Sequence, residues 1–559
     1  MMPAFLYAQI TPDQLPPAAD PSRVENIRPL QPDTDEALIP AAPKKEVAAA
    51  VPAGAENIKF VLKELRIEGM TAFTARDVQP LYAHLLSREI SLADLFSVMV
   101  ALQKEYNEAG YTLSKVVIPN QEIEDGTATL TVIEGYVAEV ELSKDVPESA
   151  IIKNAIQRIY AMRPLNTKVL ERILLILNRL PETNISAILA SLNRVDSATA
   201  EPGAVRLVLQ QNKQDVPTGE IRIDNYGSVF SGPYEASIRK DFFNIGKKYS
   251  RLETYYSTTA QTPEQRYVFG RYSLPIWGVS GAEFFVGASK AWTKPGSSLD
   301  VLDIEGISTK IMTGISYPLV LQRDKICTLD ASFDISNAYT KLLGDRFYDD
   351  RQRVLRSGIG YSFSDSGNGI NTVDFHYHKG LGILGVRDKG SQDLSRAEGD
   401  PTFDKVTGLL SRAQALPSNF ELTLRLSGQY AVQPLLSSEE FGFGGEGIGR
   451  GYDSSEITGD RGFSASLELR HRGQGYLKDL PFIIEPYIFY DFGKVWNIDP
   501  SSANTLSGAT TGGGIEINVN NQWDGNLLFA WPLTRSIENP PKYANEQGPR
   551  FLLSIGRRF

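Results

Sequence analysis

The chain has little cysteine and little histidine: its 559 residues include one cysteine, Cys327, and four histidines. A single cysteine excludes an internal disulfide framework and any zinc cluster built from several thiolates. The sequence contains no run of 18 consecutive apolar residues, so no transmembrane helix is predicted. The formal net charge of −10 argues against nucleic-acid binding, because nucleic-acid-binding proteins carry a basic patch. If the chain crosses a membrane, it must do so with strands.

Residue types that could carry catalysis are not grouped: there is no Ser-His-Asp set, paired-carboxylate motif or H-E-x-x-H. Residues 442–447 match G-x-G-x-x-G, but loop residues rather than a helix follow, which argues against nucleotide binding. Asp374, His376 and His378 share one strand face and could hold a metal. We interpret them instead as polar residues facing a lumen. The sequence therefore predicts no enzyme, no catalytic residue, no cofactor and no metal site.

The first 56 residues have little apolar periodicity. Residues 1–9 (MMPAFLYAQ) resemble the end of a signal peptide without its basic start; a disordered N-terminus is the alternative. Residues 10–56 are rich in proline and alanine and are predicted to be a tether. A helix around residues 22–27 would be kept short by the surrounding prolines.

Residues 57–136 have the pattern of a β-α-α-β-β domain. Thr74 and Ser91 are each followed three residues later by an aspartate, which resembles a capping box and predicts two helix starts. The second helix carries an apolar stripe, which we interpret as core, and Gly110 ends it. The predicted strands are 61–68, 114–118 and 127–133, with Asp125-Gly126 in the last turn.

The same order of elements recurs in residues 137–213. The predicted strands are 137–142, 186–192 and 205–210, and the predicted helices are 151–161 and 168–180. A period of about 75 residues with one element order indicates a tandem repeat of the domain.

Residues 214–559 replace helical periodicity with strict alternation. For example, apolar residues at 422, 424 and 426 alternate with polar residues at 421, 423, 425 and 427. This pattern fits half-buried antiparallel strands, in either a soluble β-sandwich or propeller or a membrane barrel. The polar face carries repeated full charges, as a water-filled lumen would, and the length of the region suits about 16 barrel strands. We therefore predict a 16-stranded transmembrane barrel.

The last strand ends on an aromatic residue with nothing after it. Phe551, Leu553, Ile555 and Phe559 lie on one face of this strand. A terminal aromatic residue is typical of outer-membrane barrels, whose last strand must close against the first. We therefore predict that Phe559 is a C-terminal assembly signal.

Two motifs of the barrel region could form a functional pair. One is Gly449-Arg450-Gly451-Tyr452, in a loop over about residues 445–461; the other is Phe489-Tyr490-Asp491-Phe492-Gly493. Period-two alternation places Phe489, Asp491 and Gly493 on the luminal face. A loop folded into the barrel could pair Arg450 with Asp491 in bidentate fashion. The alternative is an exposed Arg450 and a solvated Asp491.

These two motifs together resemble the two-partner secretion transporters, the haemolysin-activator and filamentous-haemagglutinin exporters. The residues Gly110-Tyr111…Ser114…Pro119-x-Gln121…Gly126…Val132-x-Glu134-Gly135 also resemble the end of that family's first periplasmic domain. The resemblance covers residues 57–559. Two departures are the proline-rich 10–56 region, which disfavours a stable plug helix, and Gly449, where the family usually has an aliphatic residue.

The resemblance implies an N-terminal plug helix, a linker, POTRA (polypeptide-transport-associated) domain 1 at 57–136, POTRA domain 2 at 137–213 and a barrel at 214–559. It also implies a functional Arg450–Asp491 pair, with Gly449, Gly451, Tyr452, Phe489 and Gly493 as motif residues. The expected location is the outer membrane of a Gram-negative bacterium, with the POTRA domains in the periplasm.

The implied function is secretion, without ATP, of a large partner exoprotein of adhesin or haemolysin type. The other expected partners are outer-membrane lipid and the barrel-assembly machinery, with no nucleic acid and a monomeric barrel. One alternative is a barrel-assembly factor, although such factors usually carry three or more POTRA domains. The other is a passive porin, which would need no such domains.

Overall fold

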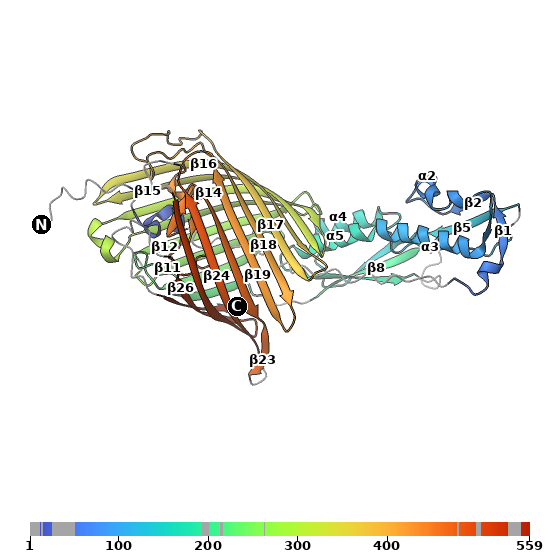
Figure 1. Ribbon diagram of the computed structural model, residues 1–559. Helices are drawn as coiled ribbons and strands as arrows, with labels where there is room; N and C mark the ends of the chain where they lie inside the picture. The colour runs from blue at the N-terminus through green and yellow to red at the C-terminus, as the bar shows by residue number, and fades with distance from the viewer. Residues whose placement is uncertain are drawn as a thin grey trace. The chain divides into compact units, whose positions relative to one another are not determined.

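The computed structural model describes residues 12, 15–24, 51–123, 125–192, 201–212, 216–261, 263–477, 480–498, 505–534 and 549–559. They form two compact units (Figure 1). One unit comprises the described residues of Ala42–Gln214 with Trp277–Gly281; the other comprises those of Met1–Ala41, Asp215–Ile276 and Ala282–Phe559. The expected signal-peptide remnant, residues 1–9, lies outside the described residues. None of the described helices has the length and apolar character needed to cross a membrane.

The first domain contains a three-stranded sheet covered by one long helix. Its elements are η5 (Ala55–Asn57), β1 (Lys59–Leu62), β2 (Glu64–Glu68), α2 (Ala75–Val78), η6 (Gln79–Leu81), η7 (Ala83–Leu85), β3 (Arg88–Ser91), α3 (Leu92–Ala109), β4 (Lys115–Val117) and β5 (Thr127–Ile133). β2 pairs with β5 in parallel and β4 pairs with β5 antiparallel, which gives the order β2-β5-β4. β1 pairs with β3 instead.

Two elements of this domain differ from the sequence prediction. The strand predicted at 61–68 is divided at Lys63, whose N–H donates to the Gly126 carbonyl at 2.8 Å, so β1 and β2 join different sheets. The helix predicted from Thr74 has its capping box with Asp77 but lasts only four residues. It continues as 3₁₀ turns because Pro80 has no N–H to donate.

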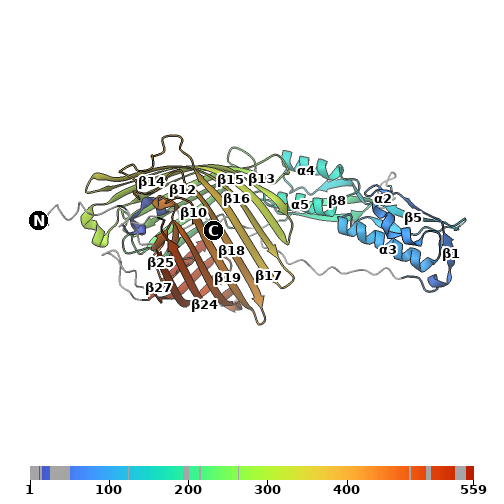
Figure 2. The same ribbon diagram turned by 45° about the horizontal axis from the view of Figure 1, so that its top comes forward.

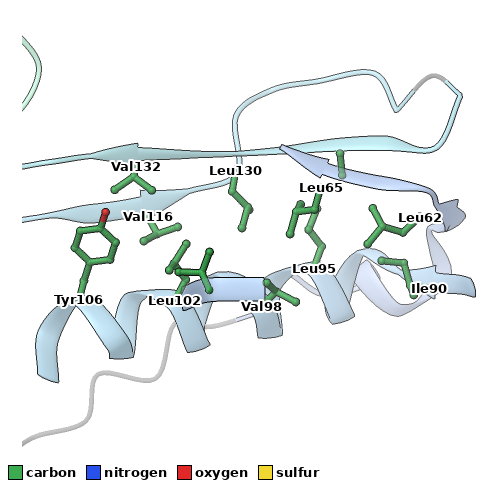
Figure 3. Packing of buried hydrophobic residues seen from close by; sticks show 12 residues of the cluster. Leu62, Leu65, Ile90, Leu95, Val98, Leu102, Tyr106, Val116, Leu130 and Val132 are labelled. Atoms are coloured by element: carbon green, nitrogen blue, oxygen red, sulfur yellow. The ribbon is translucent and has the colours of Figure 1, made fainter. Parts of the chain in front are cut away.

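The long helix α3 packs its apolar face against the strands in the core of the first domain (Figure 3). Ser91 and Asp94 form the capping box at its start, and Gly110 ends it in the left-handed conformation with φ 99°. Leu95, Leu102 and Tyr106 are fully buried against the sheet. The predicted apolar stripe of this helix is therefore core.

The second domain repeats the order strand, two helices, two strands. Its elements are β6 (Tyr136–Leu142), α4 (Ala150–Tyr160), α5 (Thr167–Asn178), β7 (Ile185–Ser191) and β8 (Ala204–Gln211). β6 runs parallel to β8 and β7 antiparallel, in the order β6-β8-β7. Strand order and directions match β2-β5-β4 of the first domain, so the two domains share one topology.

Glu134, just after β5, connects the segment that follows β2 to helix α3. It accepts hydrogen bonds from the Thr71 and Ala72 N–H groups at 2.8 Å each, from the Tyr106 hydroxyl at 2.7 Å and from the Thr71 hydroxyl. Burial alone would raise the pKa of Glu134, but these hydrogen bonds outweigh it and hold the pKa below its usual value. Next to it, a Cβ on Gly135 would lie 2.6 Å from Leu113 Cβ. The Glu134-Gly135 motif is thus explained by the fold.

Glu134→Gln is expected to destabilise the first domain by about 1–3 kcal/mol at neutral pH, because an amide cannot accept all four hydrogen bonds. A lowered carboxyl pKa stabilises the fold above the usual pKa, and this stabilisation is lost as pH falls through the lowered value. The gap between wild type and variant should therefore close in acid. Urea unfolding of the full chain, followed by its helical circular dichroism at several pH values, measures it. Glu122→Gln, at an exposed position, is the control; equal midpoints for wild type and Glu134→Gln at neutral pH would refute the assignment.

The second unit contains a closed antiparallel barrel. Its strands are β9 (Gly219–Asp224), β10 (Glu235–Phe243), β11 (Arg251–Thr259), β12 (Gln265–Ile276), β13 (Ala282–Thr293), β14 (Glu305–Leu321), β15 (Lys325–Leu342), β16 (Asp345–Ser364), β17 (Gly369–Gly380), β18 (Asp404–Leu416), β19 (Phe420–Ala431), β22 (Arg461–His471), β23 (Gly473–Leu477), β24 (Leu480–Trp496), β25 (Thr505–Val519), β26 (Trp523–Pro532) and β27 (Arg550–Arg558). β22 and β23 both pair with β24 and are separated only by Arg472, so the described residues form the predicted 16 strands.

The C-terminal residue lies at the closing seam of the barrel. β27 pairs with β9 from Ser554↔Asp224 to Arg558↔Glu220. Phe559 then extends the seam: its N–H donates to the Gly219 carbonyl at 2.9 Å, and its carbonyl accepts from Gly219 N–H at 3.0 Å. The terminal aromatic residue therefore takes part in closure, while its role as an assembly signal stays a prediction.

Candidate functional site

Residues 432–460, which we call the lumen loop, connect β19 to β22 and fold back against the inner wall of the barrel. They contain η9 (Ser437–Glu439), β20 (Phe441–Phe443) and β21 (Ile457–Gly459), the last two paired antiparallel. The predicted loop covered only residues 445–461, because three-residue strands are too short to be recognised from alternation. The Gly449–Tyr452 motif lies between the two short strands.

The inner wall opposite this motif is β24. Tyr487, Phe489 and Asp491 are buried, whereas Ile488 and Tyr490 between them are 62% and 47% exposed. The two faces are those that the alternation predicts, with Phe489 and Asp491 turned toward the lumen.

Arg450 binds Asp491 through two hydrogen bonds. Its Nε donates to Oδ2 at 3.0 Å and its Nη2 to Oδ1 at 2.9 Å, with Asp491 fully buried and Arg450 7% exposed. Such a bidentate pair is strong and fixes the orientation of both groups. The sequence led us to expect this contact, and it is present; its role in transport stays a prediction.

Three further wall residues hold the Arg450 guanidinium. Nη1 donates to Glu468 at 2.6 Å, Nη2 donates to the Ser466 hydroxyl at 3.2 Å, and the guanidinium carbon lies 3.6 Å from the centre of the Phe489 ring. Phe489, a motif residue, therefore makes a cation–π contact with the guanidinium. Sequence reasoning missed Glu468 and Ser466, because the register of β22 against β24, which places Ser466 opposite Asp491, was not predictable from the alternation.

The backbone of the motif also binds Asp491. The N–H groups of Gly449 and Arg450 donate to its Oδ2 at 3.0 and 3.2 Å. Gly449 has a positive φ of 78°, and a Cβ there would meet the Gly444 backbone at 2.8 Å. This conformation explains why an aliphatic residue is absent at position 449 in this chain.

The remaining motif residues pack the loop hairpin onto the wall. Phe443, Tyr452, Ile457 and Val495 form one buried cluster, and the Tyr452 hydroxyl donates to the Ala509 carbonyl at 3.2 Å. Two glycines make close approach possible: a Cβ on Gly451 would lie 2.5 Å from Thr510 Oγ1. A Cβ on Gly493 would collide with the Phe443 ring. The lack of a side chain at Gly451 in the loop and at Gly493 in the wall thus lets the loop and the wall approach closely.

The histidine pair lies elsewhere on the wall. Both ring nitrogens of His378 are engaged, Nδ1 with Arg356 at 2.7 Å and Nε2 with Thr407 at 3.0 Å, and His376 lies 3.4 Å from Asp330. The described residues contain no group of three or more His, Cys, Asp or Glu side chains placed to bind a metal.

The described N-terminal residues, 15–24, belong to the same unit as the barrel, and the blue segment lies within the barrel outline in Figures 1 and 2. They form two 3₁₀ turns, η3 (Pro17–Ala19) and η4 (Pro21–Arg23), and η4 lies against β13, β14 and β15. The helix expected around residues 22–27 is described only as far as Val24. We call residues 15–24 the luminal segment.

The luminal segment is held by polar and apolar contacts that sequence reasoning missed. The Tyr348 hydroxyl donates to Asp20 at 2.7 Å, and Arg23 forms a buried ion pair with Glu440 of the lumen loop. Leu15 and Ala19 pack into a buried cluster with Phe230 and with Leu299 and Leu302 of η8 (Ser297–Leu302). Proline and alanine indicated a tether; no local signal revealed these distant partners.

Two βααββ domains followed by a 16-stranded barrel that holds its own loop define an outer-membrane transporter with periplasmic domains. Comparisons agree. Residues 203–515 match the model of the haemolysin secretion/activation protein family ShlB/FhaC/HecB, and residues 60–135 match the ShlB-type POTRA domain. The chain belongs to the ShlB/FhaC/HecB family. It is an outer-membrane transporter of the two-partner secretion type, with its POTRA domain in the periplasm.

Individual relatives have low sequence identity to this chain, but the similarity extends over most of its length. The chain is 24% identical over 531 residues to the heme/hemopexin transporter protein HuxB of Haemophilus influenzae, covering 90% of this chain and 88% of the relative. It is 22% identical over 501 residues to the outer membrane transporter CdiB of Dickeya dadantii, covering 85% and 83%. The solved structure of CdiB from Escherichia coli has the same fold, with a TM-score of 0.77, 16% identity and coverage of 92% and 93%.

Gly493→Ala is expected to push Phe443 off the wall and weaken docking of the lumen loop by about 1–3 kcal/mol. The assembled barrel should then be cleaved faster by protease within residues 432–460. Gly447→Ala is the matched control, since a Cβ there meets nothing within 4 Å. Equal cleavage of the two variants would contradict the assigned contact.

Proposed function

We propose that the chain exports one large exoprotein of adhesin or haemolysin type, and that the lumen loop keeps the path through the barrel competent. The observation that carries this proposal is the buried Arg450–Asp491 pair, which fixes a loop inside the lumen rather than outside it. A wide barrel without such a loop would serve as a passive pore. A transporter must instead hold its lumen in a defined state until the partner arrives.

We assign POTRA domains to residues 57–136 and 137–213, with the barrel from residue 214 onward. Each three-stranded sheet offers two edge strands, β2 and β4 in the first domain and β6 and β7 in the second. An unfolded partner could add as a further strand at one of these edges, since backbone pairing requires little sequence specificity. We expect a monomeric barrel in contact with outer-membrane lipid, inserted by the barrel-assembly machinery.

Transport then needs no ATP and no catalytic step. A polar lumen lets an extended chain pass without exposing its backbone to lipid, and folding outside the cell gives the direction. The luminal segment, residues 15–24, would have to leave before a chain could pass, because it occupies the space next to β13, β14 and β15. It is the part of the tether that we assign as a plug.

The test is release of the exoprotein encoded beside this gene, in a Gram-negative host with the wild-type chain, with no chain and with Arg450→Ala. Arg450→Ala should abolish release while the barrel still assembles, because removing one partner of a buried pair costs about 3–5 kcal/mol. Arg450→Lys should be impaired too, since lysine cannot form the two-pronged contact. Partner retained in the periplasm by the wild type would refute the export proposal. Normal release by Arg450→Ala would remove only the loop–wall pair from the mechanism.

The joint variant Asp20→Ala/Arg23→Ala is expected to free the luminal segment, because it removes its contacts with Tyr348 and Glu440. The purified protein in planar bilayers should open more often than the wild type, by about tenfold for a loss of about 1.4 kcal/mol. Lys389→Ala, which removes only a half-exposed ion pair with Asp400, is the control. Unchanged conductance in the joint variant would show that these contacts do not hold the plug.

A further inference from the structure

A groove of about 540 Å³ lies on the outer, lipid-facing wall of the barrel. Strand pairing aligns nine of its twelve lining residues in two rows on this outer face, while Tyr255, Phe269 and Ser289 between them lie on the inner face. One row is Ile238, Tyr256, Val268, Lys290 and Thr309; the other is Lys240, Thr254, Gly270 and Ala288. The groove is hollow because the second row has small residues at its centre, where a Cβ on Gly270 would meet only Glu253 O at 3.9 Å. Its size and apolar walls suit an acyl chain.

Cations lie at one end of this groove. Arg266 and Lys290 flank Trp292 on the neighbouring strands, with the guanidinium carbon 5.5 Å and the ammonium nitrogen 5.0 Å from the indole ring. Arg266 pairs with Trp292 across β12 and β13, and all three side chains point outward. No carboxylate among the described residues lies within ion-pair distance of Arg266 or Lys290. Two cations beside an aromatic ring therefore face the lipid, and no carboxylate of the described part of the chain neutralises them.

This end of the groove belongs to the outer leaflet. β9 begins at the end of the barrel that follows the POTRA domain in the chain, which is the periplasmic end. The row containing Arg266 pairs through Thr258 and Ala236 to Ile223, near the opposite end of β9. Arg266 and Trp292 therefore lie at the outer interface, where cations and aromatic side chains meet lipid headgroups.

We propose that this surface binds a phosphorylated glycolipid of the outer leaflet, of the lipid A class. Its phosphate would contact Arg266 and Lys290, and an acyl chain would occupy the groove over Gly270 and Ala288. Lys240, at the far end, is already engaged: its ammonium donates to the Thr218 hydroxyl at 2.7 Å and lies 4.9 Å from the Phe559 ring. The headgroup site is therefore at the Arg266 end.

The test uses the full chain, purified in detergent micelles and titrated with diphosphorylated lipid A, with bound lipid counted by native mass spectrometry. We expect one tightly bound lipid in the wild type. The affinity of Arg266→Gln/Lys290→Gln for lipid A should be lower by a factor of at least about ten. Gly270→Leu, which fills the groove without touching the cations, should weaken binding as well. Dephosphorylated lipid A should bind poorly, and inorganic phosphate should not displace lipid A.

Lys494→Gln is the matched control. Lys494 also faces outward beside a tryptophan, 5.3 Å from the ring of Trp496, but it borders no residue of the groove. This variant should bind lipid A like the wild type. Equal affinity of wild type and Arg266→Gln/Lys290→Gln, or an equal loss in Lys494→Gln, would overturn the proposal. Unchanged binding by Gly270→Leu would overturn it too, as would displacement of lipid A by inorganic phosphate.

Discussion

A barrel of sixteen strands encloses more space than its own inward side chains can fill, and the rest of this structure depends on that constraint. Two segments far apart in the sequence, residues 15–24 and the lumen loop at 432–460, lie against the inner wall. The inward residues of the strands therefore serve as a docking surface rather than as a packed core. Gly493 illustrates the difference, because the space above it is taken by Phe443 from the loop and not by a neighbouring wall side chain. Wall motif and loop motif are two sides of one contact.

The chemistry of docking suits a contact that is specific and that, as the proposed transport requires, can be reversed. The Arg450–Asp491 pair is buried, so removing one partner by mutation leaves an unpaired buried charge and is costly in free energy. The free-energy difference between the intact pair and two separately hydrated partners is small. The demanding geometry of a bidentate pair with two further backbone donors makes docking close to all-or-none. In an undocked state both charges return to the water of a polar lumen. An apolar loop of the same size would gain more by burial and would expose apolar surface when released.

The sequence predicted those features that depend on local rules. Capping boxes and Gly110 located α3, and alternation located the barrel strands and the inward direction of Asp491. Prediction failed where structure depends on strand register or on contacts between segments far apart in the sequence. Glu468 joined the Arg450 site because the register of β22 against β24 sets Glu468 opposite Phe489, and alternation does not encode that register. The composition of residues 10–56, rich in proline and alanine with little apolar periodicity, predicts a tether. The burial of the luminal segment comes from partners more than 200 residues away, such as Tyr348.

The two lumen segments meet at the base of the loop, and the contacts there suggest an order of release. Glu440 binds Arg23 of the luminal segment and also lies 3.3 Å from Arg396. When the luminal segment leaves, Glu440 keeps a cationic partner, so no buried carboxylate is left unpaired. When the lumen loop leaves, Asp491 loses Arg450 and both backbone donors, and only the Ser466 hydroxyl at 2.7 Å remains. Departure of the luminal segment therefore breaks fewer polar contacts than departure of the loop, which favours its release before any movement of the loop.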